Sequence, residues 1–312
     1  MKKNSRIYVA GHTGLIGSAL LRRLKEQSYS NIITRTHKAL DLTNQPAVDR
    51  FFAKEKPEYV FLAAARVGGI HANKTYPAEF IYQNLMIQTN VLDCALKHKT
   101  KKLLNLSSSC IYPKKCKQPM KEEYLFSGDI EETNDAYGMA KLAGIKMCQA
   151  YRRQYGANFI SAIPANVYGP GDHFDENGHV LAALLGKFHT ARKSNKKSVT
   201  LWGTGKPKRE FLYVDDAADG CLFLMKKYNS AETINLGIGR ETSITQLAKL
   251  IRSTVGYKGS TSFDTSKPDG NPRRLLDSSR IHALGWQANV SLEDGLQRTY
   301  DWYCSQLAVT TK

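Results

Sequence analysis

The feature that most constrains the fold of this sequence is a glycine-rich turn between a short apolar run and a helix-length amphipathic segment. The apolar run Arg6–Ala10 leads directly into Gly11-His12-Thr13-Gly14-Leu15-Ile16-Gly17. Glycines allow a tight turn and let the backbone approach a pyrophosphate, whose charge then faces the N-terminus of the following helix. Three glycines can also be ordinary turn chemistry, but the flanking strand and helix patterns favour a dinucleotide-binding unit.

The N-terminal half of the chain alternates short β-rich runs with amphipathic segments of helical length. The expected strands are Arg6–Ala10, Asn31–Thr34, Tyr59–Ala63, Lys102–Leu106 and Phe159–Pro164, and the expected helices are Leu15–Gln27, Pro46–Glu55, Phe80–Lys97 and Ala136–Tyr155. Such alternation predicts βαβ units in an open parallel sheet with helices on both faces. The predicted fold class is therefore α/β, a Rossmann-type doubly wound sheet, with ligands at the carboxyl ends of its strands.

The alternation breaks after Tyr168-Gly169-Pro170-Gly171, where a polar loop runs to His179. A strand at Thr233–Leu236 is expected to return to the main sheet, and helices are expected at Ile244–Val255 and Leu292–Tyr303. We expect residues 1–170, with 212–240, to form the nucleotide-binding domain. Residues 171–211 and 241–312 are expected to form a smaller C-terminal α/β substrate-binding domain.

Composition limits the partners. The 45 basic and 28 acidic residues give a net charge of +17, which favours anionic ligands. The basic residues stand in short scattered groups, so we expect nucleotide or sugar-nucleotide ligands and no nucleic-acid partner. Apolar runs are far shorter than a membrane span, and the N-terminus lacks a signal-peptide core, so we expect no membrane association and a cytoplasmic location. The six cysteines form no Cys-x-x-Cys pair, and no metal site is expected.

The segment after the second predicted strand bears on the choice of cofactor. It reads Thr34-Arg35-Thr36-His37-Lys38, with no acidic residue before Asp41. A carboxylate here would repel a 2′-phosphate, whereas Arg35, aided by His37 or Lys38, can pair with one. A solvated basic turn is the alternative, but the pattern favours NADP. Asp41 and Leu42 then stand where a strand end would meet the adenine.

Tyr137 and Lys141 stand one helical turn apart in Tyr-x-x-x-Lys and share a helix face. The lysine charge is expected to lower the tyrosine pKa from about 10, which would make the phenol an acid toward a carbonyl oxygen. This motif alone is common on surface helices. Ser107-Ser108-Ser109 strengthens the interpretation because it follows the strand Lys102–Leu106 at the ligand edge of the sheet.

With these motifs in this order, the chain resembles the extended short-chain dehydrogenase/reductase family. More specific segments are Leu62–Ile70, Asn73–Ala78, Phe80–Asn84, Ser108–Pro113, Arg209–Phe211 and Ser266–Gly270. With these segments the chain resembles the GDP-L-fucose synthases, which are NADPH-dependent 3,5-epimerase-4-reductases of GDP-4-keto-6-deoxy-D-mannose. The resemblance runs from about Arg6 to Tyr303.

The resemblance implies a role for several residues. Ser108, Tyr137 and Lys141 would form the reduction triad, and Cys110 and His179 the acid/base pair of epimerisation. The NADP contacts would add Leu106, Ser107, Pro164, Ala165, Asn166, Val167 and His179 to the glycine turn, Arg35, His37, Asp41 and Leu42. Lys187, Trp202, Arg209 and Asp269 would hold the GDP-sugar. A homodimer would form through a four-helix bundle of Phe80–Lys97 and Ala136–Tyr155.

The sequence departs from that family pattern at three positions. Family members often carry Arg where Thr13 and His37 stand, two positions expected to contact the NADP phosphate, so Arg35 would carry more of that contact alone. They also often carry Arg where Lys187 stands, which keeps the charge but loses the bidentate fork. From the residues themselves, His173 and His189 compete with His179. The rival functions are a 4,6-dehydratase or 4-epimerase of another nucleotide sugar, and a catalytically silent nucleotide-binding protein of the same fold.

Overall fold

The computed structural model describes residues 1–175 and 178–310, and its largest element is a parallel sheet. In the described chain this sheet has six strands in the order β10-β5-β4-β3-β1-β2. The strands are β1 (Ile7–Ala10), β2 (Ile32–Ile33), β3 (Tyr59–Leu62), β4 (Lys102–Leu106), β5 (Phe159–Pro164) and β10 (Ile234–Leu236). Every pairing between them is parallel. The predicted Rossmann-type sheet is confirmed, and so is the return of the strand near residue 234.

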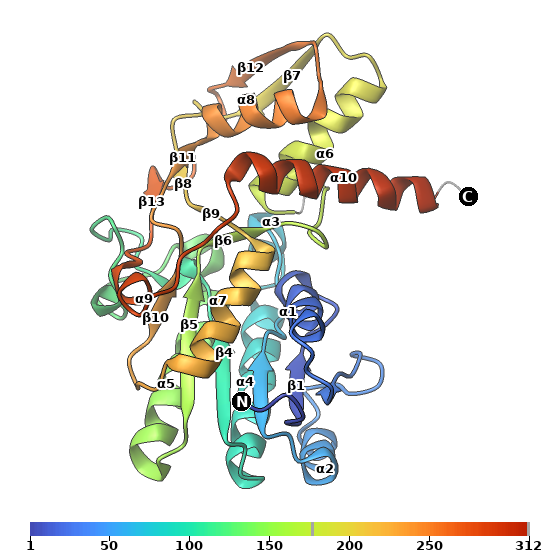
Figure 1. Ribbon diagram of the computed structural model, residues 1–312. Coiled ribbons are helices and arrows are strands. Elements are labelled where there is room, and N and C mark those ends of the chain that lie inside the picture. Colours follow the sequence, from blue (N-terminus) through green and yellow to red (C-terminus); the bar gives the residue numbers. More distant parts are fainter. Residues whose placement is uncertain (176–177, 311–312) are drawn as a thin grey trace.

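Helices cover both faces of the sheet (Figure 1). Helices α1 (Leu15–Glu26) and α7 (Val214–Lys227) pack together on one face. Helices α2 (Gln45–Glu55), α4 (Pro77–Lys97) and α5 (Asp135–Tyr155) cover the other. Strand β1 shows why both faces must be covered: Ile7 and Val9 pack in the cluster of α1, whereas Tyr8 packs in the cluster of α2. Alternate side chains of a buried parallel strand point to opposite faces, so both faces are apolar.

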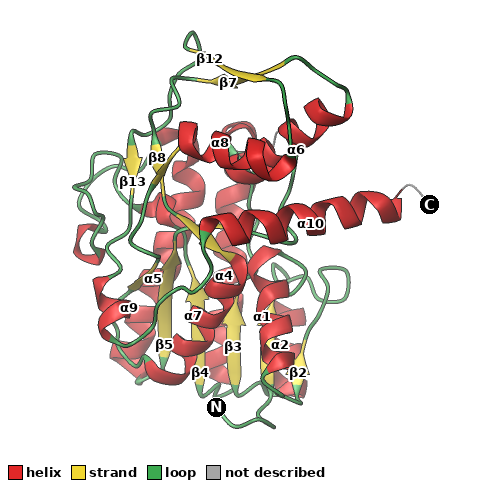
Figure 2. Cartoon of the chain, turned by 45° about the horizontal axis from the view of Figure 1, so that its top comes forward, coloured by secondary structure: helices red, strands yellow, loops and turns green. Residues whose placement is uncertain are grey.

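The remaining elements lie beyond the carboxyl ends of the main strands (Figures 1 and 2). They include α6 (Val180–Lys193), α8 (Ile244–Val255) and α10 (Leu292–Thr310). Three small sheets accompany them: β6 (Asn166–Tyr168) with β9 (Phe211–Tyr213), β7 (Ser198–Trp202) with β12 (Ser260–Asp264), and β8 (Lys208–Arg209) between β11 (Thr242–Ser243) and β13 (Arg273–Arg274). The domain boundaries at residues 170, 211 and 240 remain a prediction.

Several short elements had no counterpart in the sequence-based prediction. They are α3 (Ile70–Thr75), α9 (Ser279–Ala283), β6, β8, β11, β12, β13 and the 3₁₀ turns η1 (Ser109–Ile111), η2 (Glu122–Tyr124) and η3 (Glu132–Asn134). Most are only two to six residues long, which is too short for a hydrophobic period to show. The edge strand β2 is also shorter than expected, since it pairs with β1 over two residues.

The last helix holds the loop that follows β6. The Phe174 ring stacks on Tyr303 of α10, with ring centroids 4.3 Å apart. In the same region, His189 Nδ1 of α6 lies 3.0 Å from the Tyr300 hydroxyl. These contacts fix the start of the loop that carries His179, although residues 176–177 lie outside the description.

The six cysteines are all free thiols. Within residues 1–175 and 178–310, no helix is both long and apolar enough to cross a bilayer. Over the same ranges, no group of three His, Cys, Asp or Glu side chains is placed to hold a metal ion.

The glycine turn gives a test of packing with a built-in control. A Cβ added at Gly17 would overlap the Gly11 carbonyl oxygen, which is backbone and has little freedom to move. We therefore expect Gly17→Ala to lower the free energy of unfolding by about 1–3 kcal/mol. A Cβ at Gly14 would meet that same oxygen at an ordinary 3.5 Å, so Gly14→Ala should be close to neutral. Urea denaturation of both variants checks this, and equal losses would contradict the packing argument.

Candidate active site

A cleft of about 590 Å³ opens at the carboxyl ends of the main strands. Its walls are the glycine turn after β1, the segments after β2 and β3, the serines after β4, and the segment after β5. The predicted cofactor residues that line it are Gly11, Thr13, Gly14, Leu15, Ile16, Gly17, Arg35, His37, Asp41, Leu42, Ser107, Ser108, Tyr137, Pro164, Ala165, Asn166, Val167 and His179. The structure therefore brings most of the predicted set to one site.

Four predicted residues lie beside the cleft rather than in its described lining: His12, Leu106, Cys110 and Lys141. Leu106 is the buried last residue of β4, and Lys141 is 2% exposed on α5. His12 Nδ1 is buried and finds no hydrogen-bond partner among the described residues.

Some cleft residues were not predicted as contacts. They are Leu40, Thr43, Ala63, Ala64, Ala65, Arg66, Val67, Tyr82, Gln83, Ile87 and Ser109. The stretch Ala63–Val67 directly follows β3, so the rule that placed the serines after β4 would also have found it. Tyr82, Gln83 and Ile87 come from α4; the first two lie in the segment Phe80–Asn84 that carries the resemblance, although no contact was assigned to them.

The glycine turn exposes the start of α1 to the cleft. Gly11 has φ +83°, and a Cβ there would lie 2.7 Å from the Ala64 backbone, so only glycine fits this approach. Gly14 N donates to Gly11 O at 3.0 Å and Gly14 is the N-cap of α1. Among the described residues, no side chain caps this helix end. Its backbone N–H groups are thus available to an anion, as a dinucleotide pyrophosphate requires.

Arg35 lines the cleft but already has an acidic partner. Its Nη2 lies 2.6 Å from Glu55 Oε1 of α2, and its Nη1 donates to Thr34 O at 2.7 Å. Nearby, the Asp41 carboxylate accepts hydrogen bonds from Thr43 N and Oγ1, which lower its pKa. The Glu55 contact was not predicted, because twenty residues separate the pair and no helical period joins them.

Tyr137 stands in the first turn of α5, with its ring edge-on to Phe80 at 6.3 Å between centroids. Burial raises the pKa of the Tyr137 phenol, the charge of Cys110 acts in the same direction, and a hydrogen bond with Ser108 opposes it. The expected lowering by Lys141 is therefore wrong. Burial also lowers the pKa of Lys141 to about 8, since the same enclosure disfavours both charged forms.

Cys110 lies in η1, two residues after Ser108, whose Oγ accepts a hydrogen bond from Cys110 N at 3.5 Å. Burial raises the pKa of the Cys110 thiol. The Ser108 hydrogen bond and the charges of Arg274 and Lys141 oppose that rise. Burial outweighs these groups, so the net effect of the surroundings is a raised thiol pKa.

His179 has the opposite environment. Its Nδ1 lies 3.4 Å from Asp172 Oδ1, and the Asp172 side chain is almost fully buried. This contact raises the pKa of His179. The competitor His189 is buried in α6 against Tyr300, and the exposed His173 is absent from the described cleft lining. The sequence did not predict the contact of Asp172 with His179, because Asp172 lies in a loop, where no helical or strand period relates it to His179.

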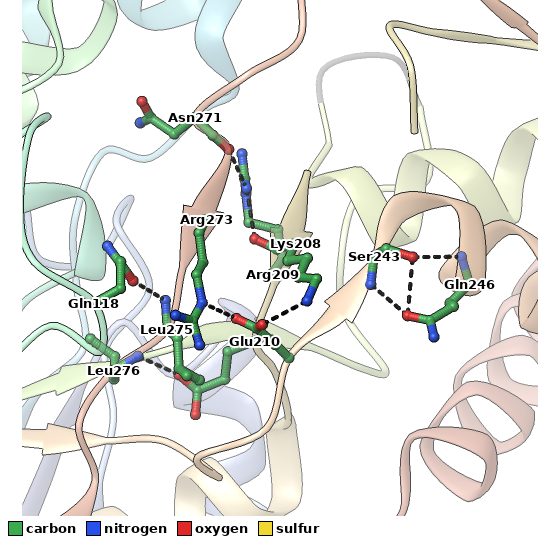
Figure 3. A network of polar contacts seen from close by, with 11 residues as sticks. Gln118, Lys208, Arg209, Glu210, Ser243, Gln246, Asn271, Arg273, Leu275 and Leu276 are labelled. Atoms are coloured by element: carbon green, nitrogen blue, oxygen red, sulfur yellow. Dashed lines mark hydrogen bonds and ion pairs between the residues drawn. The ribbon is translucent and has the colours of Figure 1, made fainter. Parts of the chain in front are cut away.

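The predicted substrate residues gather around β7, β8 and the loop before β13. Lys187 Nζ donates to Thr200 O at 2.6 Å, and Trp202 at the end of β7 is 72% exposed. Asp269 accepts from Thr204 N at 2.8 Å, two residues beyond Trp202. Arg209 Nη1 donates to the carbonyls of Lys208 and Asn271 (Figure 3). Burial lowers the pKa of Arg209 to about 10.

The His179–Asp172 contact predicts a measurable titration. We expect Asp172→Asn to lower the pKa of His179, because the amide keeps the hydrogen bond from His173 N but loses the charge. Since the contact raises the folded-state pKa, it contributes stability below the unfolded value and loses it as the pH rises through the folded value. NMR titration of the histidine ring protons measures this, with His189 as the internal control. An unchanged His179 titration would show that Asp172 does not act on it.

Comparisons with known proteins agree with this arrangement. Residues 7–237 match the NAD dependent epimerase/dehydratase family. "GDP-L-fucose synthase 1" of Arabidopsis thaliana is 55% identical over 302 residues, 96% of this chain and 94% of that protein.

Two solved structures are also close. A GDP-6-OMe-4-keto-L-xylo-heptose reductase from C. jejuni superimposes with a TM-score of 0.93 at 41% identity, covering 98% of this chain and 99% of that one. A GDP-L-fucose synthetase from Naegleria fowleri bound to NADP gives a TM-score of 0.91 at 31% identity, covering 100% and 98%. The chain belongs to the NAD dependent epimerase/dehydratase family.

Proposed function

We propose that this enzyme uses NADPH to convert GDP-4-keto-6-deoxy-D-mannose to GDP-L-fucose, by epimerisation at C3 and C5 and reduction at C4. The observation that carries the proposal is that one cleft joins the glycine turn to Ser108, Tyr137 and His179, with the backbone of Cys110 donating to Ser108 Oγ. The name of the 55% identical Arabidopsis relative supports the choice of substrate.

The cleft fits a nicotinamide dinucleotide. The uncapped N-terminus of α1 suits the pyrophosphate, and Arg35 suits a 2′-phosphate. When bound, NADPH supplies the hydride for C4. The Naegleria structure bound to NADP supports this cofactor, and the glycine turn supports its orientation with the pyrophosphate toward α1.

Ser108 and Tyr137 would hold the C4 carbonyl oxygen. Both belong to the cleft, and Ser108 acts on the Tyr137 phenol as a hydrogen-bond partner. Because burial keeps the Tyr137 phenol protonated, it can donate its proton to the oxygen as negative charge develops there. Lys141 lies on the same face of α5 as Tyr137 and supplies a buried cation beside the phenol that donates the proton.

Cys110 and His179 would carry the two epimerisations. The C4 ketone acidifies the hydrogens at C3 and C5, so a Cys110 thiolate can take a proton while the electron pair moves to the carbonyl oxygen. His179, whose pKa is raised by the contact with Asp172, can return a proton to carbon on the opposite face. Cations near Cys110 and a carboxylate near His179 suit these different roles.

The substrate diphosphate would lie at Arg209, whose guanidinium donates to carbonyl oxygens and keeps its charge available. Lys187 adds a second cation, although without the planar fork of arginine. The exposed ring of Trp202 offers a face for guanine. Asp269 would reach the substrate from the loop that it braces through Thr204.

We also propose a homodimer through α4 and α5 and a cytoplasmic location. The two helices pack on each other within the chain, where Gln88 Nε2 donates to Ala140 O at 2.8 Å. Exposed apolar side chains remain on both helices, namely Tyr82, Met139 and Tyr155. These exposed apolar side chains support a four-helix bundle with a second copy, although Tyr82 also lines the cleft.

The cofactor assignment predicts an effect of Arg35→Asp. Losing a charge-assisted contact should weaken NADPH binding by about 1–3 kcal/mol and leave NADH binding much less affected. Lys54→Asp is the matched control, since it makes a comparable charge change at an exposed position of α2 outside the described cleft lining. Fluorescence titration with both cofactors measures the difference. Equal catalytic efficiency of the unmutated enzyme with NADPH and NADH would refute the assignment.

The assignment of Cys110 predicts that the two activities separate. Cys110→Ser should slow exchange of the C3 and C5 hydrogens with D₂O by about 10²–10⁴, the usual contribution of a positioned base. Cofactor binding and reduction of pre-epimerised ketone should persist, because hydride delivery to C4 needs no base at C3 or C5. Cys116→Ser, another partly buried thiol, is the control.

Exchange is followed by NMR, with GDP-4-keto-6-deoxy-D-mannose and a GDP-4-keto-heptose as parallel substrates. The second substrate is included because of the likeness to the C. jejuni reductase. Exchange at the unmutated rate in Cys110→Ser would mean that the base lies elsewhere. Reduction of the heptose alone would move the proposal to that substrate class.

A further inference from the structure

Arg274 contacts the segment Ser108–Cys110, here called the catalytic loop, from a distant part of the chain. It is the last residue of β13, and its Nη1 donates to Ser109 O at 2.9 Å across 165 residues. Ser109 stands between Ser108 and Cys110, so the guanidinium holds the carbonyl at the centre of the segment that carries both proposed catalytic groups. The contact fixes η1 from the substrate side.

A second residue, Asn271, also fixes the orientation of this guanidinium. With its amide turned to accept, the Asn271 side-chain oxygen lies 3.1 Å from Arg274 Nε and 3.0 Å from Nη2. Strand β13 also pairs in parallel with β8, which places Arg274 opposite Arg209. Figure 3 shows Arg209, Asn271 and Arg273 around these two strands.

The charge of Arg274 is not cancelled by an ion pair. Among residues 1–175 and 178–310, Glu131 is the carboxylate whose charge acts on the pKa of Arg274, and it forms its ion pair with Lys114 at 3.1 Å instead. Arg274 is also largely enclosed, and burial lowers its pKa. A partly buried guanidinium without a carboxylate partner acts over a short range on whichever group can become an anion.

We propose that Arg274 is a positioning residue of the epimerisation site, which fixes the Ser108–Cys110 segment and stabilises the Cys110 thiolate. This inference rests on the proposed role of Cys110 as a base.

The groups that face Cys110 come from three elements. They are Ser108 at η1, Tyr137 and Lys141 on α5, and Arg274 on β13. Lys141 and Arg274 favour the thiolate, whereas burial opposes it. Lys141 also serves the proposed reduction triad, whereas Arg274 has no part in that triad and donates to the backbone of the thiol segment.

The test reads the thiol directly and needs no substrate. The rate of alkylation of Cys110 by iodoacetamide is measured against pH, with the labelled peptides separated by mass spectrometry. Arg274→Gln should slow alkylation at neutral pH by about tenfold and move the profile to higher pH, because the thiolate is the nucleophile. Arg274→Lys should restore most of the rate. Cys304 of α10 is the internal control in each sample.

A second variant keeps the test decisive if Arg274→Gln folds poorly, which thermal melting and NADPH binding would reveal. Asn271→Asp leaves Arg274 in place but sets a carboxylate against Nε and Nη2, so it should slow alkylation in the same direction. An unchanged Cys110 profile in the folded variants overturns the inference.

The D₂O exchange assay separates this inference from the proposed function. Slower C3 and C5 exchange in Arg274→Gln, with reduction of pre-epimerised ketone retained, supports both. A shifted alkylation profile together with normal exchange in Cys110→Ser would support the Arg274–Cys110 interaction and refute the role of Cys110 as a base.

Discussion

The substrate side of the site depends on a single buried carboxylate. Glu210 is 1% exposed, and its oxygens accept backbone hydrogen bonds from Ile238 N, Gly239 N and Leu276 N at 2.6, 2.8 and 2.9 Å. It therefore ties the junction of β8 and β9 to the segments that follow β10 and β13 (Figure 3). A buried donor without an acceptor costs about 1–3 kcal/mol, so this one side chain fixes the strands that present Arg209 and Arg274.

Burial, more than any neighbouring charge, sets the chemistry of the catalytic loop. It raises the pKa of Tyr137 and Cys110 and lowers that of Lys141, so each group is moved toward its neutral form. A phenol held neutral is well suited to give a proton to an oxyanion. A thiol held neutral is poorly suited to act as a base, which is why the cations around Cys110 matter.

The sequence was sufficient to predict the main sheet, its covering helices and most of the cleft. Strands β4 and β5 and helix α8 have the predicted limits, because long apolar periods and glycine turns are local signals. The missed groups depend on contacts between distant residues. These contacts are Glu55 with Arg35, Asp172 with His179, and Arg274 with the Ser109 carbonyl. The spacing of these residues in the sequence does not predict that they meet. The lowered tyrosine pKa was wrong because sequence spacing carries no information on burial.

The stacking of Phe174 on Tyr303 has a consequence for how the two half-reactions respond to change. The loop that bears His179 is braced by α10, whereas Ser108 and Tyr137 belong to the main sheet and α5. With the roles proposed above, the acid of epimerisation has a mechanical support that Ser108, Tyr137 and Cys110 do not share. Substitutions in α10 would first displace the loop that carries His179. The products would then lose their defined configuration at C3 and C5, while the proposed reduction at C4 continued.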